Sequence, residues 1–265
     1  MAQPIITFTT DSGPNDHFVG TMKGVVLSLN PAAQMVDICN NVYSFDVLDG
    51  ALTIGSSYKY FPAGTVHMVV VDPGVGSQRR PLLVTTHTYH FIAPDNGVLS
   101  MIYDQEERVI VRHITAEHYF LHPVSHTFHG RDIFAPVAGY VSRGVEPHKI
   151  GEEITDFVRF KLPKAQKTSE GAMKGVILKV DKFGNLMTNF RPEELPEIFA
   201  DGRKFKLSVG NTTVSTLHDF YAEGKSGEVF AIVGSMGYLE IAANRAAAAQ
   251  VVGANRGSEV QIEVA

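Results

Sequence analysis

The segment Asp72-Pro73-Gly74-Val75-Gly76-Ser77-Gln78-Arg79-Arg80 directly follows an apolar run, Val66–Val71, that predicts a buried β-strand. A carboxylate, two glycines and an arginine therefore gather where a strand ends. Open α/β sheets bind ligands at the carboxyl ends of their strands, and glycine lets the backbone approach a ligand closely. The alternative is an ordinary turn with solvated arginines, because Asp, Pro and Gly are common turn residues. The segment indicates an α/β fold and a candidate ligand site.

The same alternation of strand and helix patterns continues on both sides of this segment. Further strands are predicted at Ile5–Thr10, Gln34–Ile38, Leu82–Thr86, His90–Ala93 and Val109–Ile114, and helices at His17–Leu29, Val47–Tyr60 and 131–141. Strands that alternate with helices are typical of βαβ units. We therefore expect residues 1–164 to form an α/β domain with a mostly parallel sheet flanked by helices.

The character of the sequence changes near residue 165. Residues 160–172 are polar and lack apolar periodicity, which predicts an interdomain linker. Strand patterns follow at Gly175–Val180, Phe205–Val209, Val229–Val233, Tyr238–Ile241 and Glu259–Val264, with a short helix predicted at Ala242–Ala249. We expect residues 165–265 to form a smaller, all-β, barrel-like domain.

Composition narrows the class of partner. The net charge of −5 argues against a nucleic-acid partner, which would require a basic face, and favours a small molecule. The single cysteine, Cys39, excludes an internal disulfide and fits a reducing compartment. No apolar run is long enough for a membrane span and no basic leader precedes one, so we expect a cytoplasmic protein without a membrane partner.

Two further clusters of polar residues lie beside predicted elements, one after the first strand and one before a helix. In the segment 9–16, Asp11 could accept hydrogen bonds from a sugar diol, and Asp16 is interpreted as the N-cap of the next helix. In the segment 127–132, His129 stands at the junction of a loop and a predicted helix.

The second domain carries its own candidate cluster at Asp181-Lys182-Phe183-Gly184-Asn185. A carboxylate, an aromatic ring and an amide so close together could hold an amine, a flat ring and the edge of a heterocycle. A β-turn is the alternative, and on this segment alone the more common one, because turns favour Gly, Asn and Asp.

In order and spacing these clusters resemble the S-adenosyl-L-methionine (SAM) hydroxide adenosyltransferases, a family related to the 5′-fluorinases and 5′-chlorinases. The resemblance covers nearly the whole chain, and its markers are Thr10–Gly13, Phe45–Val47 with Gly50 and Ala51, Asp72–Arg79, Ile92–Gly97, Thr127–Asp132, Asp181–Asn189 and Gly234–Ala242. It implies an N-terminal α/β domain, a C-terminal β-barrel-like domain, and a homotrimer with active sites between the N-terminal domain of one subunit and the C-terminal domain of the next.

The resemblance also implies roles for individual residues. It carries over a triad of Asp72, Arg79 and His129 that handles the attacking water, with His129 able to accept a proton near neutrality. It further implies that Asp11 binds the ribose hydroxyls, Phe45 and Phe128 form walls near C5′, Asp181 binds the methionine ammonium, Ser235 binds its carboxylate, and Phe183, Asn185 and Tyr221 form the adenine pocket. Met236 stands where an arginine often follows this serine, so Ser235 and backbone donors are expected to hold the carboxylate.

The activity implied is hydrolysis of SAM to adenosine and L-methionine by attack of water on C5′, with no metal and no cofactor. A 5′-halogenase is disfavoured because the extra loop of the halogenating relatives is absent before Ile92, and because Asp72 and Arg79 are present. A nucleoside hydrolase is disfavoured because residues 9–16 lack two of the four carboxylates in that family's calcium-binding run. The intact triad argues against a non-catalytic binder of adenosine or SAM.

Overall fold

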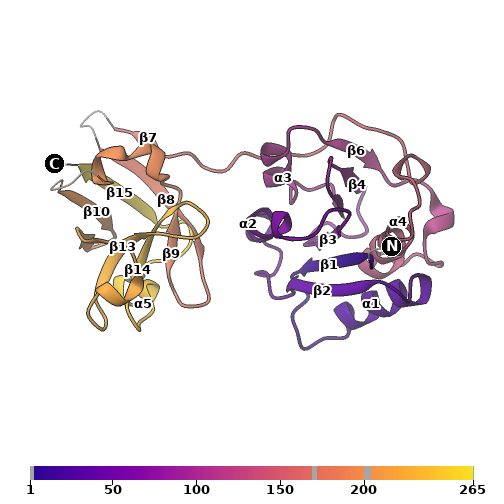
Figure 1. The fold of residues 1–265 in the computed structure, drawn as a ribbon, viewed down its shortest axis with the longest axis horizontal. Coiled ribbons are helices and arrows are strands. Elements are labelled where there is room, and N and C mark those ends of the chain that lie inside the picture. The colour runs from indigo at the N-terminus through magenta and orange to yellow at the C-terminus, as the bar shows by residue number, and fades with distance from the viewer. Residues whose placement is uncertain (1–2, 169–171, 200–203, 265) are drawn as a thin grey trace. The chain divides into compact units, whose positions relative to one another are not determined.

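The chain divides into two compact units, Met1–Lys161 and Leu162–Ala265. The computed structural model in Figure 1 describes residues 3–168, 172–199 and 204–264. Part of the predicted linker, residues 169–171, lies outside the described residues. Each unit has its own hydrophobic core, so each is described separately.

A six-stranded sheet forms the centre of the first unit (Figure 1). Its strands are β1 (Ile5–Thr10), β2 (Gln34–Cys39), β3 (Val66–Val70), β4 (Pro81–Thr85), β5 (His90–Pro94) and β6 (Ile110–His113), in the order β2-β1-β3-β5-β4-β6. The pairs β1–β2, β1–β3 and β3–β5 are parallel, whereas β4 is antiparallel to both β5 and β6.

The prediction of a mostly parallel sheet was therefore wrong for the part that contains β4, and the sheet is mixed. The residues between β4 and β5 close a tight turn, in which the Thr86 amide donates to the Tyr89 carbonyl oxygen at 2.9 Å. So short a connection can join only antiparallel neighbours, since a parallel crossover needs a dozen residues or more.

Helices cover both faces of this sheet. They are α1 (Phe18–Leu29), α2 (Val47–Ser57), α3 (Ser100–Gln105) and α4 (Ala135–Ser142), and a π-helix, Gly130–Phe134, leads directly into α4. Single-turn 3₁₀ helices lie at Tyr58–Tyr60, Glu117–Tyr119, Pro147–Lys149, Pro192–Glu194, Pro196–Phe199 and Tyr221–Glu223. None of the described helices is long and apolar enough to cross a membrane.

Alternation of side chains along the strands produces two core layers. In β5, Ile92 packs into the layer that includes residues of α1 and α4, whereas Phe91 and Ala93 pack into the layer that includes residues of α2 and α3. Successive residues of a strand point to opposite faces, so a strand covered on both sides is apolar throughout. This burial explains the unbroken apolar runs in the sequence.

The topology places the first two polar clusters at one edge. Strand β1 lies between β2 and β3 and is parallel to both. The chain therefore passes from β1 to β2 on one side of β1, and then from β2 to β3 on the opposite side of β1. Thr10 and Val70 are paired in register at the carboxyl ends of β1 and β3. Such a switch point is where open α/β sheets bind ligands. The loops after β1 and β3 therefore begin side by side.

The second unit is a curled, mostly antiparallel sheet. Its strands are β7 (Gln166–Lys167), β8 (Met173–Val180), β9 (Leu186–Thr188), β10 (Phe205–Val209), β11 (Thr212–Val214), β12 (Leu217–His218), β13 (Val229–Val233), β14 (Leu239–Ala243) and β15 (Glu259–Val264). The order is β11-β10-β15-β8-β9-β14-β13-β12, with β7 paired to β8. Over the described strands, no pairing joins β12 back to β11, so this is a half-barrel.

One predicted helix in this unit is displaced. The observed helix α5 spans Ala248–Val252, whereas the sequence predicts Ala242–Ala249. Ala242 and Ala243 instead continue β14 and pair with Phe230 and Val229 of β13. Burial in the sheet overrides the high helix propensity of alanine at these two positions.

Candidate active site

Asp72, Arg79 and His129 form one continuous hydrogen-bonded group. The Arg79 Nε donates to both carboxylate oxygens of Asp72, at 3.0 and 2.9 Å, and Nη2 donates to Asp72 Oδ2. Nη2 also donates to His129 Nδ1 at 2.8 Å. The side chains of Arg79 and Asp72 are only 8% and 5% exposed. The structure thus brings together the three residues of the predicted triad.

This hydrogen bond determines the tautomer of His129. An arginine side chain has donors and no acceptor, so Nδ1 must accept, and a neutral ring then carries its proton on Nε2. Burial and the adjacent Arg79 lower the pKa of His129 from its ordinary value. In this arrangement the ring is neutral and can donate from Nε2, and it can take up a proton only by giving up its bond to Arg79.

Arg79 retains one unused donor. Its Nη1 atom is buried and has no hydrogen-bond partner among the described residues, while the guanidinium carbon lies 5.3 Å from the centre of the Phe134 ring. A buried donor without an acceptor is unfavourable by about 1–3 kcal/mol, more if charged, so a ligand oxygen that reached it would be held firmly.

Two loops hold this group in place. Gly76 has a φ of +77°, in the left-handed region, and a Cβ atom there would lie 2.1 Å from the carbonyl oxygen of His126. The Asp72–Arg79 loop therefore contacts the loop before His129 through backbone alone. That second loop is fixed by the buried Asp132, which accepts hydrogen bonds from the Ser125 amide at 2.8 Å and from Arg131 Nε at 2.6 Å.

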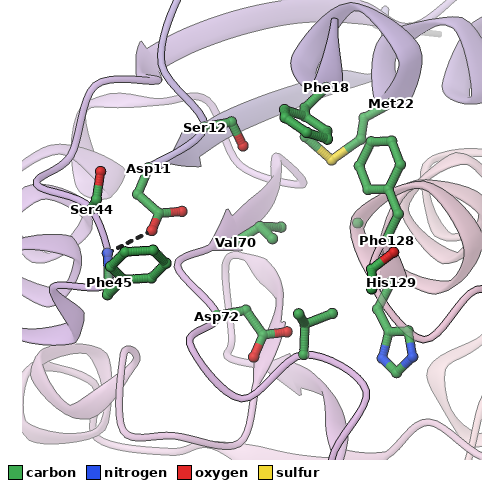
Figure 2. A pocket seen from close by; sticks show the side chains of 13 residues that line it. Asp11, Ser12, Phe18, Met22, Ser44, Phe45, Val70, Asp72, Phe128 and His129 are labelled. Atoms are coloured by element: carbon green, nitrogen blue, oxygen red, sulfur yellow. Dashed lines mark hydrogen bonds between the residues drawn. The ribbon is translucent and has the colours of Figure 1, made fainter. Parts of the chain in front are cut away.

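A cavity of about 320 Å³ adjoins the triad (Figure 2). It is lined by Asp11, Ser12, Phe18, Met22, Ser44, Phe45, Val70, Asp72, Val75, Thr127, Phe128, His129 and Gly130. The lining includes every predicted site residue of the first unit except Arg79, which is bonded to Asp72 and His129. Phe18 and Met22 were missed, because their four-residue spacing on α1 resembles an ordinary core face.

Asp11 has a structural partner in this cavity. Its Oδ2 atom accepts a hydrogen bond from the Phe45 amide at 2.8 Å (Figure 2). Phe45 has a φ of +65°, a left-handed conformation that costs a residue with a side chain about 1–2 kcal/mol. The residue is 73% exposed although it lines the cavity. Asp11 therefore helps to stabilise the backbone that presents Phe45.

Asp16, by contrast, does not cap the helix as predicted. Helix α1 begins at Phe18, so His17 occupies the N-cap position, where no side-chain capping bond is made. Asp16 is exposed one residue earlier.

The second unit contains a larger cavity, of about 740 Å³, within the range of small-molecule sites. It is lined by Asp181, Phe183, Asn185, Tyr221, Ser235, Ala243, Arg245, Ala246 and Ala247. All predicted contacts of this unit are included except Met236. Arg245 was missed, and its φ of +55° is again left-handed for a residue with a side chain.

Asp181 organises its own turn. Its Oδ1 accepts from the Phe183 and Asn185 amides, both at 2.8 Å, and its Oδ2 accepts from Asn185 Nδ2 at 2.8 Å. The segment is therefore both the β-turn and the wall of a cavity, so the two alternatives drawn from the sequence are not exclusive. The exposed Phe183 ring, 78% accessible, stands out from this turn.

Comparison with known protein families shows which family the chain belongs to. Residues 6–151 match the N-terminal domain of the SAM hydroxide adenosyltransferases, and residues 175–261 match the C-terminal domain of the same family. The chain belongs to this family. The resemblance predicted from the motifs is thereby confirmed.

Individual members of the SAM hydroxide adenosyltransferase family and its relatives match over nearly the full chain. An (R)-S-adenosyl-L-methionine hydrolase of Methanocaldococcus jannaschii is 32% identical over 89% of this chain and 87% of its own length. A fluorinase of Nocardia brasiliensis is 26% identical over 99% of this chain and 97% of its own. The crystal structure of an uncharacterized conserved protein from Thermotoga maritima, 33% identical, superposes with a TM-score of 0.90 over 97% of this chain and 99% of its own.

Proposed function

We propose that this SAM hydroxide adenosyltransferase hydrolyses SAM to adenosine and L-methionine. The observation that carries the proposal is the Asp72–Arg79–His129 group, whose Asp72 and His129 line a cavity that also contains the diol acceptor Asp11. The name of the relative from M. jannaschii, a SAM hydrolase, supports the same substrate.

The reaction is a single displacement at C5′. The oxygen of water forms a bond to C5′ while the C5′–S bond breaks, and the bonding pair leaves on sulfur as a neutral thioether. Sulfur therefore needs no general acid. The oxygen nucleophile loses one proton, which is released to solvent, so that SAM and water give adenosine, L-methionine and a proton. The residues of the site therefore act on the oxygen rather than on the leaving group.

The resting hydrogen bonds suggest how each residue acts on that oxygen. The positive charge of Arg79, which is bonded to the cavity-lining residues Asp72 and His129, favours hydroxide over water, since preorganised charge stabilises such an anion most in a dry site. Asp72 pairs with Arg79 so that neither charge is buried alone. His129 orients the oxygen through Nε2–H.

The configuration at sulfur is part of the proposal. In the name of the M. jannaschii relative, the adenosyl and L-methionine parts already specify the carbon centres, so "(R)" designates the sulfonium. We infer that this chain prefers the same epimer, because with C5′ and sulfur in line with the nucleophile the configuration at sulfur decides which side of the C5′–S bond the methionine arm occupies.

The direct test follows the oxygen atom. Incubation of the protein with SAM in ¹⁸O-labelled water is expected to place the label in the 5′-hydroxyl of adenosine, detected by mass spectrometry, and faster with the R epimer. Free adenine and ribose would indicate a nucleoside hydrolase instead. A 5′-halogenated product in chloride or fluoride would indicate a halogenase, and adenosine without label would overturn the mechanism.

We also propose that the chain acts as a homotrimer in which the first unit of one subunit and the second unit of the next complete one site. The support is that each unit carries a different part of the residue set, with the triad and Asp11 in one and the Asp181 cluster in the other.

Mixing two inactive variants tests this assembly. Arg79→Ala and Asn185→Ala are each expected to be inactive alone, whereas their random co-assembly restores about one quarter of the sites in a cyclic trimer. Activity is measured after joint refolding, with the separately refolded variants as controls. No recovery in verified mixed trimers would show that both units of one site come from the same subunit.

A further inference from the structure

His218 is a largely buried histidine of the second unit that the roles above leave unused. It ends β12, its side chain is 16% exposed, and its ring lies 4.7 Å from the ring of Phe230 at an angle of 64°. Its Nε2 atom is buried and has no hydrogen-bond partner among the described residues. A buried polar atom without a partner is uncommon in a folded protein, so the groups that face this ring indicate its role.

Two carboxylates of the 219–228 loop, which joins β12 to β13, flank the ring. Glu223 Oε2 lies 3.6 Å from His218 Nδ1, and Glu228 Oε1 lies 4.0 Å from His218 Nε2. An imidazole carries a proton on at least one of its two nitrogens, so at least one carboxylate faces an N–H group. Both distances are too long for hydrogen bonds, so the ring attracts the carboxylates electrostatically.

The same two carboxylates also bond to the backbone of the 219–228 loop. Glu223 Oε2 accepts a hydrogen bond from the Asp219 amide at 2.8 Å, and Glu228 Oε2 accepts one from the Lys225 amide at 2.7 Å. Each carboxylate therefore has the loop backbone on one side and the His218 ring on the other. A change at the ring is transmitted to the loop through both glutamates.

A glycine lets the 219–228 loop lie directly on the buried rings. A Cβ atom on Gly224 would be 2.7 Å from Phe230 Cε1 and 3.6 Å from His218 Cδ2. The Gly224 carbonyl oxygen accepts a hydrogen bond from Asn244 Nδ2 at 2.7 Å, which holds the loop beside the end of β14. His218 and Phe230 thus form the surface on which the loop packs.

The 219–228 loop carries Tyr221, which lines the larger cavity. Tyr221 and Glu223 lie in the same 3₁₀ turn, so displacement of Glu223 displaces Tyr221 as well. The Tyr221 ring is 6.4 Å from the ring of Phe230, at an angle of 61°. Tyr221 and His218 are therefore connected in two ways, through one turn of the backbone and through one shared aromatic ring.

We propose that His218 is a positioning residue that holds the 219–228 loop so that Tyr221 forms an aromatic wall of the larger cavity, and that it thereby sets the affinity for the base of the substrate. The inference rests on the proposed function, in which Tyr221 contacts the adenine ring. His218 lines neither cavity, so it acts only through the loop. The energy of an aromatic contact depends on the relative geometry of the rings, so a wall that is held in place binds a flat base more tightly than a loose one.

The ligand affinities of His218→Phe test this role. Phenylalanine keeps an aromatic ring against Phe230 and removes both nitrogens that the carboxylates face. Calorimetry is expected to show adenosine binding about tenfold weaker, a loss in the range of one base–aromatic contact, with L-methionine binding unchanged. With SAM, KM is expected to rise by a similar factor while kcat stays within about threefold, because the base is bound equally in the ground and transition states.

His148→Phe provides the matched control. His148 Nε2 also lies 4.0 Å from a glutamate oxygen, that of Glu146, but the His148 side chain is 62% exposed and lines neither cavity. The control variant is expected to keep the wild-type affinity for adenosine and the wild-type KM. Equal weakening in the two variants would show that the loss does not come from the 219–228 loop and would overturn the proposal.

A double-mutant cycle separates positioning from a general structural role. If His218 acts through Tyr221, then in a Tyr221→Ala background His218→Phe is expected to weaken adenosine binding by less than about twofold, because residues that act together have non-additive effects. A merely structural role would give the same factor in both backgrounds. Equal factors would therefore refute the positioning role even if His218→Phe alone weakened binding.

Binding to the wild-type protein separates failure of this inference from failure of the proposed function. If the wild-type protein binds adenosine and releases it from SAM, but His218→Phe keeps its adenosine affinity, the role of His218 is refuted alone. A wild-type protein that neither binds adenosine nor releases it from SAM would overturn the proposed function and this inference with it. Should His218→Phe fail to fold, the smaller His218→Leu also removes both nitrogens, and unchanged adenosine affinity there would equally refute the role.

Discussion

The Arg79→Ala variant is expected to release adenosine more slowly by about 10²-fold or more, the usual effect of removing one preorganised donor. The substitution removes the unused Nη1 donor and the bonds to Asp72 and His129 together. It also leaves the Asp72 charge buried without its partner. Because the proposed substrate contacts lie on other residues, KM is expected to change far less than kcat, which steady-state kinetics with SAM measures.

The neighbouring Arg80 provides the matched control. Arg80 bonds to Asp95 at 2.9 Å and to the exposed Asp156 at 2.8 Å, and it lines neither cavity. Arg80→Ala is therefore expected to lower thermal stability while kcat stays within about threefold of wild type. Loss of activity in Arg80→Ala with retention in Arg79→Ala would reverse the assignment of the triad.

Gly76→Ala is expected to lower adenosine release by about tenfold or more, because misplacing a site by a fraction of an ångström is severe for catalysis. A methyl group at Gly76 would meet the His126 carbonyl oxygen at 2.1 Å, closer than any such contact, so one loop must move. The loops that would separate carry Arg79 and His129, whose hydrogen bond joins them. The measurement is kcat together with the thermal unfolding midpoint.

Gly64→Ala is the control that distinguishes the steric clash at Gly76 from the effect of backbone strain. Gly64 has a φ of +82°, similar to Gly76, but a Cβ atom there would contact nothing within 4 Å. Both variants bear the strain of about 1 kcal/mol that a left-handed alanine carries, so both are expected to lose some stability. Only Gly76→Ala is expected to lose activity. Equal activity in the two variants would show that the contact between the loops is dispensable.

The sequence predicted the positions of individual strands better than it predicted the direction in which neighbouring strands pair. Strands β1 and β10 have the predicted bounds because buried apolar runs flanked by turn residues are strong signals. The antiparallel direction of β4 was missed because apolarity marks a buried strand without giving its direction. Only Ala248 and Ala249 of the predicted Ala242–Ala249 helix are helical, and at Ala242 and Ala243 strand pairing outweighs propensity.

The candidate site was predicted where motifs are contiguous and missed where strand geometry supplies the residue. Motif order led to Asp72, Arg79 and His129, which the structure brings into contact. Arg245 lies two residues past the end of β14 and resembles an ordinary turn residue in the sequence. Its place in the larger cavity depends on the pairing of β14 with β9, which follows the Asp181 turn, and that pairing cannot be read from spacing.

The bond from the Phe45 amide to Asp11 couples two parts of the first cavity thermodynamically. A ribose diol that competes for the same carboxylate oxygen would loosen the left-handed residue, and a diol that takes Asp11 Oδ1 would leave it in place. Substitutions at Asp11 and Phe45 are therefore expected to have non-additive effects, because loss of Asp11 removes a carboxylate from the cavity and releases the Phe45 backbone at once. The Asp11 carboxylate and the placement of the Phe45 ring therefore form one cooperative unit.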